Sequence, residues 1–159
     1  MIALDLDGTL AIANNQVSPA TRDALHELHE GGVEVVIATG RRYRSTRYVI
    51  ENLGIDTFAV CNGGALVKTP DQKTLHRDTY DISPIVEVAR SLGLALFAQR
   101  DAHDHGGVDF VIDSGVPWSD VIKQYYENNR EWSAPVDLLD AEPEFLVSGV
   151  FGSEAELWE

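Results

Sequence analysis

The first 70 residues alternate between short apolar runs and longer amphipathic stretches. The apolar runs lack the strict alternation of a half-exposed strand, so they predict strands that helices cover on both faces. These runs occupy residues 2–6, 33–40 and 57–67, and the last one runs into a glycine turn. Helical periodicity predicts two helices between them, over 17–32 and 41–54. Strands and helices in this order predict a doubly wound α/β unit with right-handed crossovers.

Local signals mark the ends of both helices. Ser18 is of the type that caps a helix N-terminus, and Pro19 suits the first helical position. Gly54 stands where the second helix should end. The buried stripe of the first helix is expected to consist of Ala24, Leu25 and Leu28.

After about Pro70 the pattern changes. Two strand-like runs, 94–99 and 108–115, are joined by a polar stretch and predict an antiparallel pair. The other elements expected in this part are helices over 83–92 and 118–129, a strand over 144–151, and a helix beginning near 153. The second half of the chain is therefore expected to form a separate α+β unit.

Polar side chains follow each of the three strands predicted in the first unit. Two aspartates, a threonine and an asparagine stand at or just beyond the strand ends. Ligands of open α/β sheets bind beyond the carboxyl ends of the strands. We therefore expect one crevice that is lined by Asp5, Asp7, Thr39, Arg41, Cys61 and Asn62.

The spacing of Asp5 and Asp7 limits the chemistry of this crevice. Two carboxylates this close repel each other unless one is protonated or both share a cation. Hard oxygen ligands with little histidine or cysteine around them favour Mg²⁺. A carboxylate can also attack phosphorus to give an aspartyl-phosphate, and a second carboxyl group can protonate the leaving oxygen and later activate water. Gly8 lets the chain turn sharply after the two aspartates.

Thr39 offers a hydroxyl and a backbone N–H at the expected start of the second helix, which suits a phosphate oxygen. Arg41, Arg42 and Arg44 fall in the expected first turn, where cations oppose the helix macrodipole. An anion in the crevice would explain this placement. Two other interpretations stay open: Thr39 as the helix N-cap, and a solvated face for Arg42 and Arg44.

Composition narrows the class of protein. Hydrophobic residues make up 44% of the 159 residues, and no apolar run approaches the ~20 residues of a membrane span. The formal charge of −14 disfavours nucleic acid and anionic membranes as partners. It does not exclude a small phosphorylated metabolite, because a local cationic pocket or a bound metal can override the global field. Cys61 is the single cysteine, so it is expected to be a buried residue rather than part of a disulfide. Without a signal-peptide pattern, the protein is predicted to be cytoplasmic.

Three motifs occur in order along the first unit: DLDGTL at 5–10, IATGR at 37–41 and CNGGAL at 61–66. Together they resemble the motifs of the haloacid dehalogenase superfamily, and more closely those of its Cof-type sugar-phosphatase branch. The resemblance implies an α/β fold: a Rossmann-like half-core with a parallel sheet and flanking helices over 1–80, then an incomplete α+β cap domain over 81–159. It also implies a Mg²⁺-dependent phosphatase, a hydrolase that acts on sugar phosphates.

The resemblance assigns roles to individual residues. Asp5 would be the nucleophile and would bind Mg²⁺ through its carboxylate. Asp7 would be the general acid/base and would bind Mg²⁺ through its backbone carbonyl. Thr39 would contact the phosphoryl group. The other residues expected to line the substrate pocket are Gly40, Arg41, Asn62 and Gly63.

Later motifs of this family, which carry a lysine and the remaining metal carboxylates, do not occur in the sequence. We therefore expect the front part of a longer enzyme, without the second half of the core sheet. Such an incomplete sheet would leave an unpaired edge and an uncovered apolar face, which favours self-association.

Other interpretations remain open. The chain could be a non-catalytic fragment or interaction module, or a phosphosugar phosphotransferase (mutase) that uses the same two aspartates. Asn62-Gly63 is also an ordinary turn dipeptide. The polar stretch 100–107 contains two aspartates and two histidines but is interpreted as a hairpin loop, because adjacent side chains point in different directions.

Overall fold

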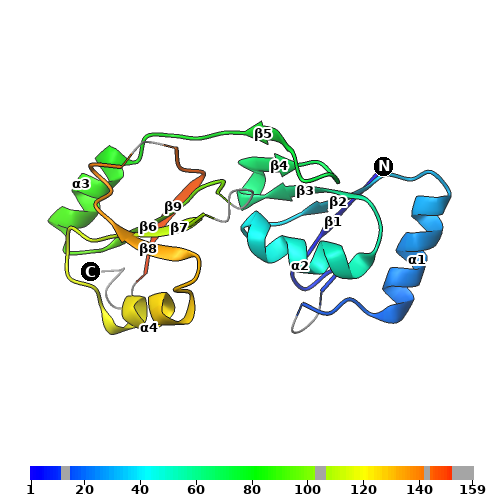
Figure 1. Ribbon diagram of the computed structural model, residues 1–159, viewed down its shortest axis with the longest axis horizontal. Helices are drawn as coiled ribbons and strands as arrows, with labels where there is room; N and C mark the ends of the chain where they lie inside the picture. The colour runs from blue at the N-terminus through cyan, green and yellow to red at the C-terminus, as the bar shows by residue number, and fades with distance from the viewer. Residues whose placement is uncertain (12–14, 103–106, 142–143, 152–159) are drawn as a thin grey trace. The chain divides into compact units, whose positions relative to one another are not determined.

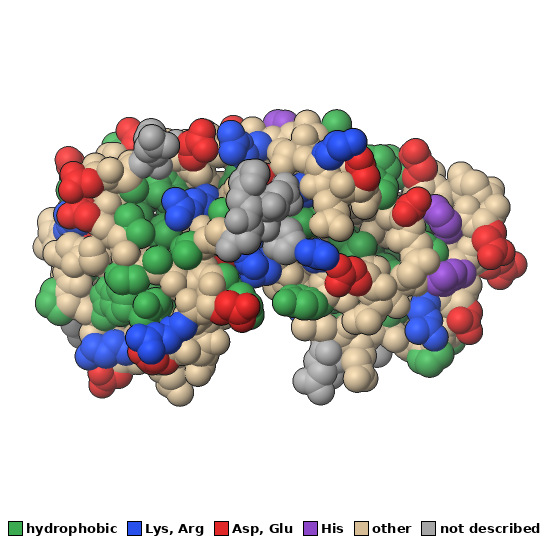
Figure 2. Space-filling model, in the orientation of Figure 1, with side chains coloured by type: hydrophobic (Ala, Val, Ile, Leu, Met, Phe, Trp, Pro, Cys, Tyr) green, Lys and Arg blue, Asp and Glu red, His purple; other side chains and the backbone are tan. Residues whose placement is uncertain are grey.

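The computed structural model describes residues 1–11, 15–102, 107–141 and 144–151. The chain folds into two compact units, Met1–Asp78 and Thr79–Glu159. No helix in these described ranges is long and apolar enough to cross a membrane. Acidic side chains are spread over both units on the face drawn in Figure 2.

Unit 1 is built on a five-stranded sheet (Figure 1). Three strands are parallel: β1 (Ile2–Asp5), β2 (Val35–Ala38) and β3 (Thr57–Cys61). The sheet continues in antiparallel fashion through β4 (Leu66–Lys68) and β5 (Thr74–Arg77), so the spatial order follows the chain order. The parallel strands confirm the α/β class that the sequence predicts.

The register of the parallel strands brings their carboxyl ends into line. Asp5 is paired with Ala38 of β2, and Ala38 is paired with Val60 of β3. Neighbouring strands lie about 4.8 Å apart. Residues that follow these three positions in the chain are therefore brought to one edge of the sheet.

Two helices cover one face of this sheet. The first, α1 (Pro19–Glu30), begins at the Ser18 N-cap, whose side chain accepts a hydrogen bond from the Thr21 N–H, as the sequence predicts. The second, α2 (Tyr43–Leu53), ends at Gly54 in the left-handed conformation. A hydrogen bond of 2.7 Å joins His26 Nε2 of α1 to the Leu53 carbonyl of α2. Both helices contribute to a core cluster with Val35 and Ile37 of β2.

Burial is one-sided in unit 1, which differs from the prediction of strands covered on both faces. Along β1, Ile2 and Leu4 are partly buried, whereas Ala3 and Asp5 are exposed. Val36 and Phe58 on the same face as Ala3 are only partly buried. Within α1 only Leu25 is buried, so the wider stripe expected with Ala24 and Leu28 is wrong. No helix of the described residues covers this second face of the sheet.

The stretch 57–67, predicted as one strand ending in a turn, forms two strands that run in opposite directions. A short 3₁₀ turn, Asn62–Gly64, separates β3 from β4. Asn62, Gly63 and Gly64 have φ values of 54°, 65° and 106°, so three consecutive left-handed residues reverse the chain. Asparagine and glycine are the residues that tolerate this conformation best.

Unit 2 contains a four-stranded sheet in the order β8-β7-β6-β9. The antiparallel pair β6 (Leu96–Gln99) and β7 (Phe110–Asp113) confirms the predicted pairing. The predicted strand near 144–151 is present as β9 (Val147–Val150), whereas β8 (Ser133–Val136), parallel to β7, had no counterpart among the predicted elements. The helix predicted from 153 lies outside the described residues, as do positions 103–106 of the polar loop.

The helices of unit 2 pack against two separate clusters. Residues of α3 (Ser83–Ser91) join a cluster with Leu96, Ala98 and Val111. Residues of α4 (Asp120–Asn128) join a second cluster in which the rings of Phe97 and Phe110 stack at 5.0 Å. Trp118, Tyr125 and Tyr126 pack against this second cluster.

An ion-pair cluster ties α3 to the sheet of unit 2. Arg90 donates from Nε to Asp113 Oδ2 at 2.8 Å and from Nη2 to Asp137 Oδ1 at 2.5 Å. The Asp113 side chain is 1% exposed. The Arg90 guanidinium lies over Gly115, where an added Cβ would come within 2.1 Å of the guanidinium carbon. A buried carboxylate is thus neutralised by one arginine.

Candidate active site

The loop after β1 presents its polar side chains to solvent because its apolar ones are anchored. Leu6 and Leu10 are buried, whereas Asp5, Asp7 and Thr9 are exposed. The loop is closed by backbone hydrogen bonds from Ala11 N to Leu6 O, at 2.8 Å, and from Gly8 N to Ala11 O, at 3.1 Å. Gly8 has φ 77°, which confirms the sharp turn expected there.

Asp5 is the last residue of β1 and its carboxylate faces solvent. The Thr9 hydroxyl donates a hydrogen bond to Asp5 Oδ2 at 3.2 Å. This bond orients one carboxylate oxygen and leaves room at the other. Thr9 was not among the residues that the sequence pointed to, although it stands four positions further along in the same motif.

Asp7 is held by Arg41 rather than by a second carboxyl group. Arg41 Nε donates to Asp7 Oδ2 at 2.9 Å, and its Nη2 forms an ion pair with Asp7 Oδ1. These bonds lower the pKa of Asp7 below its ordinary value. Arg41 Nη1 also donates to Asn15 Oδ1 at 2.5 Å, and Asn15 has φ 60°. Sequence reasoning found neither the pair nor Asn15.

Backbone hydrogen bonds join the loops that follow β2 and β3. Thr39 N donates to the carbonyl of Val60, and Gly63 N donates back to the Thr39 carbonyl, at 2.9 and 3.2 Å. Asn62 N donates to the Arg41 carbonyl at 2.9 Å. Residues of two motifs, Thr39 and Arg41 from IATGR and Asn62 from CNGGAL, are thus brought together.

Thr39 is 7% exposed, and its Oγ1 accepts a hydrogen bond from Arg41 N at 3.2 Å. The alternative of Thr39 as the N-cap is wrong, because α2 begins at Tyr43 and its N-cap is Arg42. For the same reason Arg41 precedes the helix and does not fall in its first turn. Gly40 is exposed, and a Cβ added there would meet nothing within 4 Å, so there is open space beside Thr39.

The donor set suits a hard divalent cation only in part. The Asp5 carboxylate and the Asp7 backbone carbonyl are oxygen ligands of the type that Mg²⁺ prefers. No described residue donates a hydrogen bond to the Asp7 carbonyl. The described residues contain no group of three acidic, histidine or cysteine side chains that could hold a metal ion. The two aspartates therefore fit a Mg²⁺ that keeps several water or substrate ligands.

Taken together, one edge of the sheet carries an exposed carboxylate, a carboxylate–guanidinium pair, and a buried threonine beside open space. Such an edge can bind a phosphoryl group and attack it. Residues 2–105 match the family described as haloacid dehalogenase-like hydrolase. The chain belongs to this family, and its Cof-type branch is the one that the three motifs predict.

Individual relatives and structures agree with this assignment. The chain is 38% identical over 81 residues to phosphatase YwpJ of Bacillus subtilis, an alignment that covers 51% of this chain and 28% of that protein. It is 30% identical over 116 residues to pyridoxal phosphate phosphatase YbhA of Escherichia coli, covering 73% of this chain and 40% of that protein. The structure of the HAD subclass IIB sugar phosphatase BT4131 has a similar fold, with a TM-score of 0.65 at 18% identity, over 98% of this chain and 59% of that one.

The aligned regions thus span about a third of the length of these curated relatives. The family match, over residues 2–105, includes all three motifs of the candidate site. Cys61 is buried, as predicted.

Proposed function

We propose that this chain carries the nucleophile and the acid/base of a Mg²⁺-dependent phosphatase that acts on small phosphorylated metabolites, with sugar phosphates as the expected class. The single observation that carries the proposal is the line-up of Asp5, Asp7 and Thr39 at the carboxyl edge of three parallel strands. We place this activity in the cytoplasm, in keeping with Cys61 as the single cysteine of the chain.

In the first step of the proposed mechanism, Asp5 attacks phosphorus and the bond from phosphorus to the leaving oxygen breaks. Asp7 gives its proton to that oxygen, so the products are an alcohol and a phosphorylated Asp5. In the second step Asp7 takes a proton from water, which attacks phosphorus and releases phosphate and free Asp5. Thr39 would bind a phosphoryl oxygen through its hydroxyl.

Bound Mg²⁺, held by the Asp5 carboxylate and the Asp7 carbonyl, would neutralise charge on the phosphoryl oxygens. The Arg41–Asp7 pair constrains this mechanism. Asp7 has a lowered pKa while Arg41 holds it, so it carries no proton to donate. Arg41 must therefore release Asp7 when substrate binds. The phosphoryl group of the substrate is the anion that can replace the Asp7 carboxylate as the partner of Arg41.

The test is Mg²⁺-dependent phosphate release from p-nitrophenyl phosphate, with Asp5→Asn as the matched control. Release that needs both Mg²⁺ and Asp5 supports the proposal, and acid-quenched protein should then carry a phosphoryl group that hydroxylamine removes. Release that survives in Asp5→Asn would refute Asp5 as the nucleophile.

A second candidate is a module that binds phosphorylated ligands without turning them over. The observation in its favour is that the described residues supply only two of the oxygen ligands for the metal. Phosphate binding that Arg41→Gln weakens, with no release of phosphate from any substrate, would favour this candidate.

We also propose that the partly buried sheet face promotes self-association, which sedimentation velocity would detect as a dimer.

A further inference from the structure

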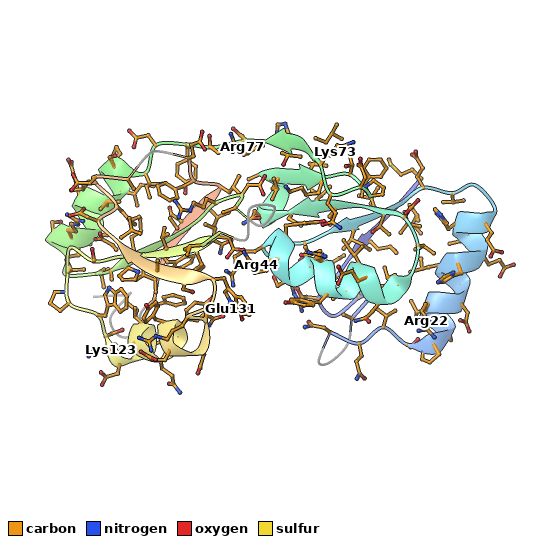
Figure 3. The ribbon with its side chains drawn as sticks, viewed as in Figure 1. Arg22, Arg44, Lys73, Arg77, Lys123 and Glu131 are labelled. Carbon is orange, nitrogen blue, oxygen red and sulfur yellow. The ribbon has the colours of Figure 1, made fainter. Side chains whose placement is uncertain are left out.

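Unit 1 has an open groove that the proposed mechanism does not use. It lies between the segment that leads into α1, the beginning of α1, and α2, and its volume is about 570 Å³. Its lining residues are mostly polar: Asn15, Gln16, Val17, Pro19, Arg22, Tyr48 and Asn52. Figure 3 labels Arg22 near the beginning of α1.

Arg22 gives the groove its charge. It carries the only formal charge among the lining residues, and no acidic side chain is among them. Arg22 is exposed and forms no ion pair within the described part of the chain. In a chain with 26 acidic and 12 basic residues, a groove lined by a cation and by no acidic side chain favours an anion, although Asp23 follows Arg22 in the sequence. A guanidinium prefers carboxylate or phosphate oxygens, which it can bind through two parallel hydrogen bonds.

Tyr48 adds an aromatic surface to the groove. Tyr48 is 55% exposed, although tyrosine residues usually bury much of their area. An exposed ring and a cation in the lining of one groove suit a planar ligand, because the ligand's ring can lie against the tyrosine face while its anionic group binds the guanidinium. The partly buried Val17 supplies an apolar wall.

Three amide side chains complete the lining. Asn52 Nδ2 donates to the Tyr48 carbonyl at 2.8 Å, so its amide oxygen is the atom left to accept from a ligand. Gln16 and Asn15 offer both donors and acceptors. Amides of this kind recognise the ring nitrogens and exocyclic groups of a heteroaromatic molecule.

We propose that this groove binds a small planar heteroaromatic molecule that carries one anionic group. The anion lies on Arg22, the ring lies on Tyr48, and the amides bind the polar edge of the ring. The groove also reaches the candidate active site, because Asn15 accepts a hydrogen bond from Arg41, which pairs with Asp7. A ligand that forms hydrogen bonds with the Asn15 amide therefore competes with the hydrogen bond from Arg41 to Asn15 and changes the surroundings of Arg41. The binding itself does not depend on phosphatase activity.

The test uses nicotinate as the probe, with two partial probes beside it. Nicotinamide has the ring without the charge, and acetate has the charge without the ring. Affinities are measured by calorimetry on the 159-residue chain, and the Arg41 Nε–H resonance is followed by NMR. Nicotinate is expected to bind about tenfold or more tightly than either partial probe, a difference of about 1.4 kcal/mol, because each partial probe lacks either the charge-assisted hydrogen bond or the ring contact.

Variants separate the groove from non-specific binding. Arg22→Gln and Tyr48→Ser should each weaken nicotinate at least about tenfold and abolish the shift at Arg41, whereas Tyr48→Phe should keep both. Arg130→Gln, at an exposed arginine of unit 2, is the matched control and should change nothing. Equal binding of nicotinamide, unchanged affinity in Arg22→Gln, or no binding of nicotinate at millimolar concentration would each overturn the proposal.

Discussion

Replacing Arg90 by leucine should destabilise unit 2 severely, because it leaves the buried Asp113 carboxylate without its counter-ion. Asp113 is 1% exposed, and Arg90 is its only basic partner among the described residues. Removing one partner of a buried ion pair costs about 3–5 kcal/mol, since an uncompensated charge stays in the interior. This is a large part of the ~5–15 kcal/mol that stabilises a typical domain. For a unit of this size the Tm should fall by roughly 12 °C or more.

The pH dependence gives the sharper test. In the wild type, burial acts to raise the pKa of Asp113, but hydrogen bonds from Arg90, Leu138 N–H and Gly115 N–H outweigh it and the pKa is lowered. Stability from this carboxylate is therefore present above its unfolded pKa of about 3.9 and is lost as the pH falls through the lower folded value. Without Arg90, burial raises the pKa instead. The loss in Arg90→Leu should then be greatest near neutral pH and shrink as acid protonates Asp113.

The assay can report on unit 2 alone. The three tryptophans of the chain are Trp118, Trp132 and Trp158, and all of them belong to this unit. Urea unfolding followed by tryptophan fluorescence therefore measures its free energy of unfolding. The control is Arg130→Leu, whose 3.5 Å pair with Glu127 is solvent-exposed and should contribute no more than about 1 kcal/mol.

A double variant completes the argument. Adding Asp113→Asn to Arg90→Leu removes the uncompensated buried charge, so part of the lost stability should return. A loss below about 1 kcal/mol in Arg90→Leu, or a loss that is the same at pH 4 and pH 7, would refute the idea that this arginine neutralises a buried carboxylate.

Three further predictions concern single contacts. Arg41→Gln should raise the pKa of Asp7, so that Asp7 stays protonated to a higher pH; a ¹³C titration of its carboxyl group that matches the wild type would contradict this. Asn62→Ala should cost about 1–2 kcal/mol more than Asn62→Gly, because φ is 54° there and glycine adopts this conformation without strain, as chemical denaturation of the two variants would show. Gly149→Ala should destabilise unit 2 by about 1–3 kcal/mol, since the new Cβ would lie 2.8 Å from the Phe97 ring; a fluorescence-monitored midpoint equal to the wild type would count against it.

Features set by a short stretch of chain could be predicted from the sequence. The N-cap at Ser18, the ends of the parallel strands and the turn at Gly8 each depend on a few adjacent residues. The convergence of Thr39 and Asn62 also follows, because parallel strands share one carboxyl edge.

Features that depend on distant partners could not be predicted. The Arg41–Asp7 pair joins residues 34 positions apart, and no periodicity connects them. The strand β5 is exposed at all four positions, so it has no hydrophobic pattern to recognise. Lys68 is fully buried in β4, where its Nζ donates to Thr74 Oγ1 at 2.8 Å, and hydropathy alone would place a lysine in solvent.

The position of β1 at one end of the sheet has a consequence for amide hydrogen exchange. Ile2 N donates to the Glu34 carbonyl, so in a parallel ladder Leu4 N also points toward β2, whereas the N–H groups of Ala3 and Asp5 point away from it. In the isolated chain, deuterium should therefore enter quickly at Ala3 and slowly at Leu4. Another strand laid along β1, whether from a second copy or from further polypeptide, would slow the exchange at Ala3. The exchange rate of one amide thus reports whether the sheet ends at β1 or continues.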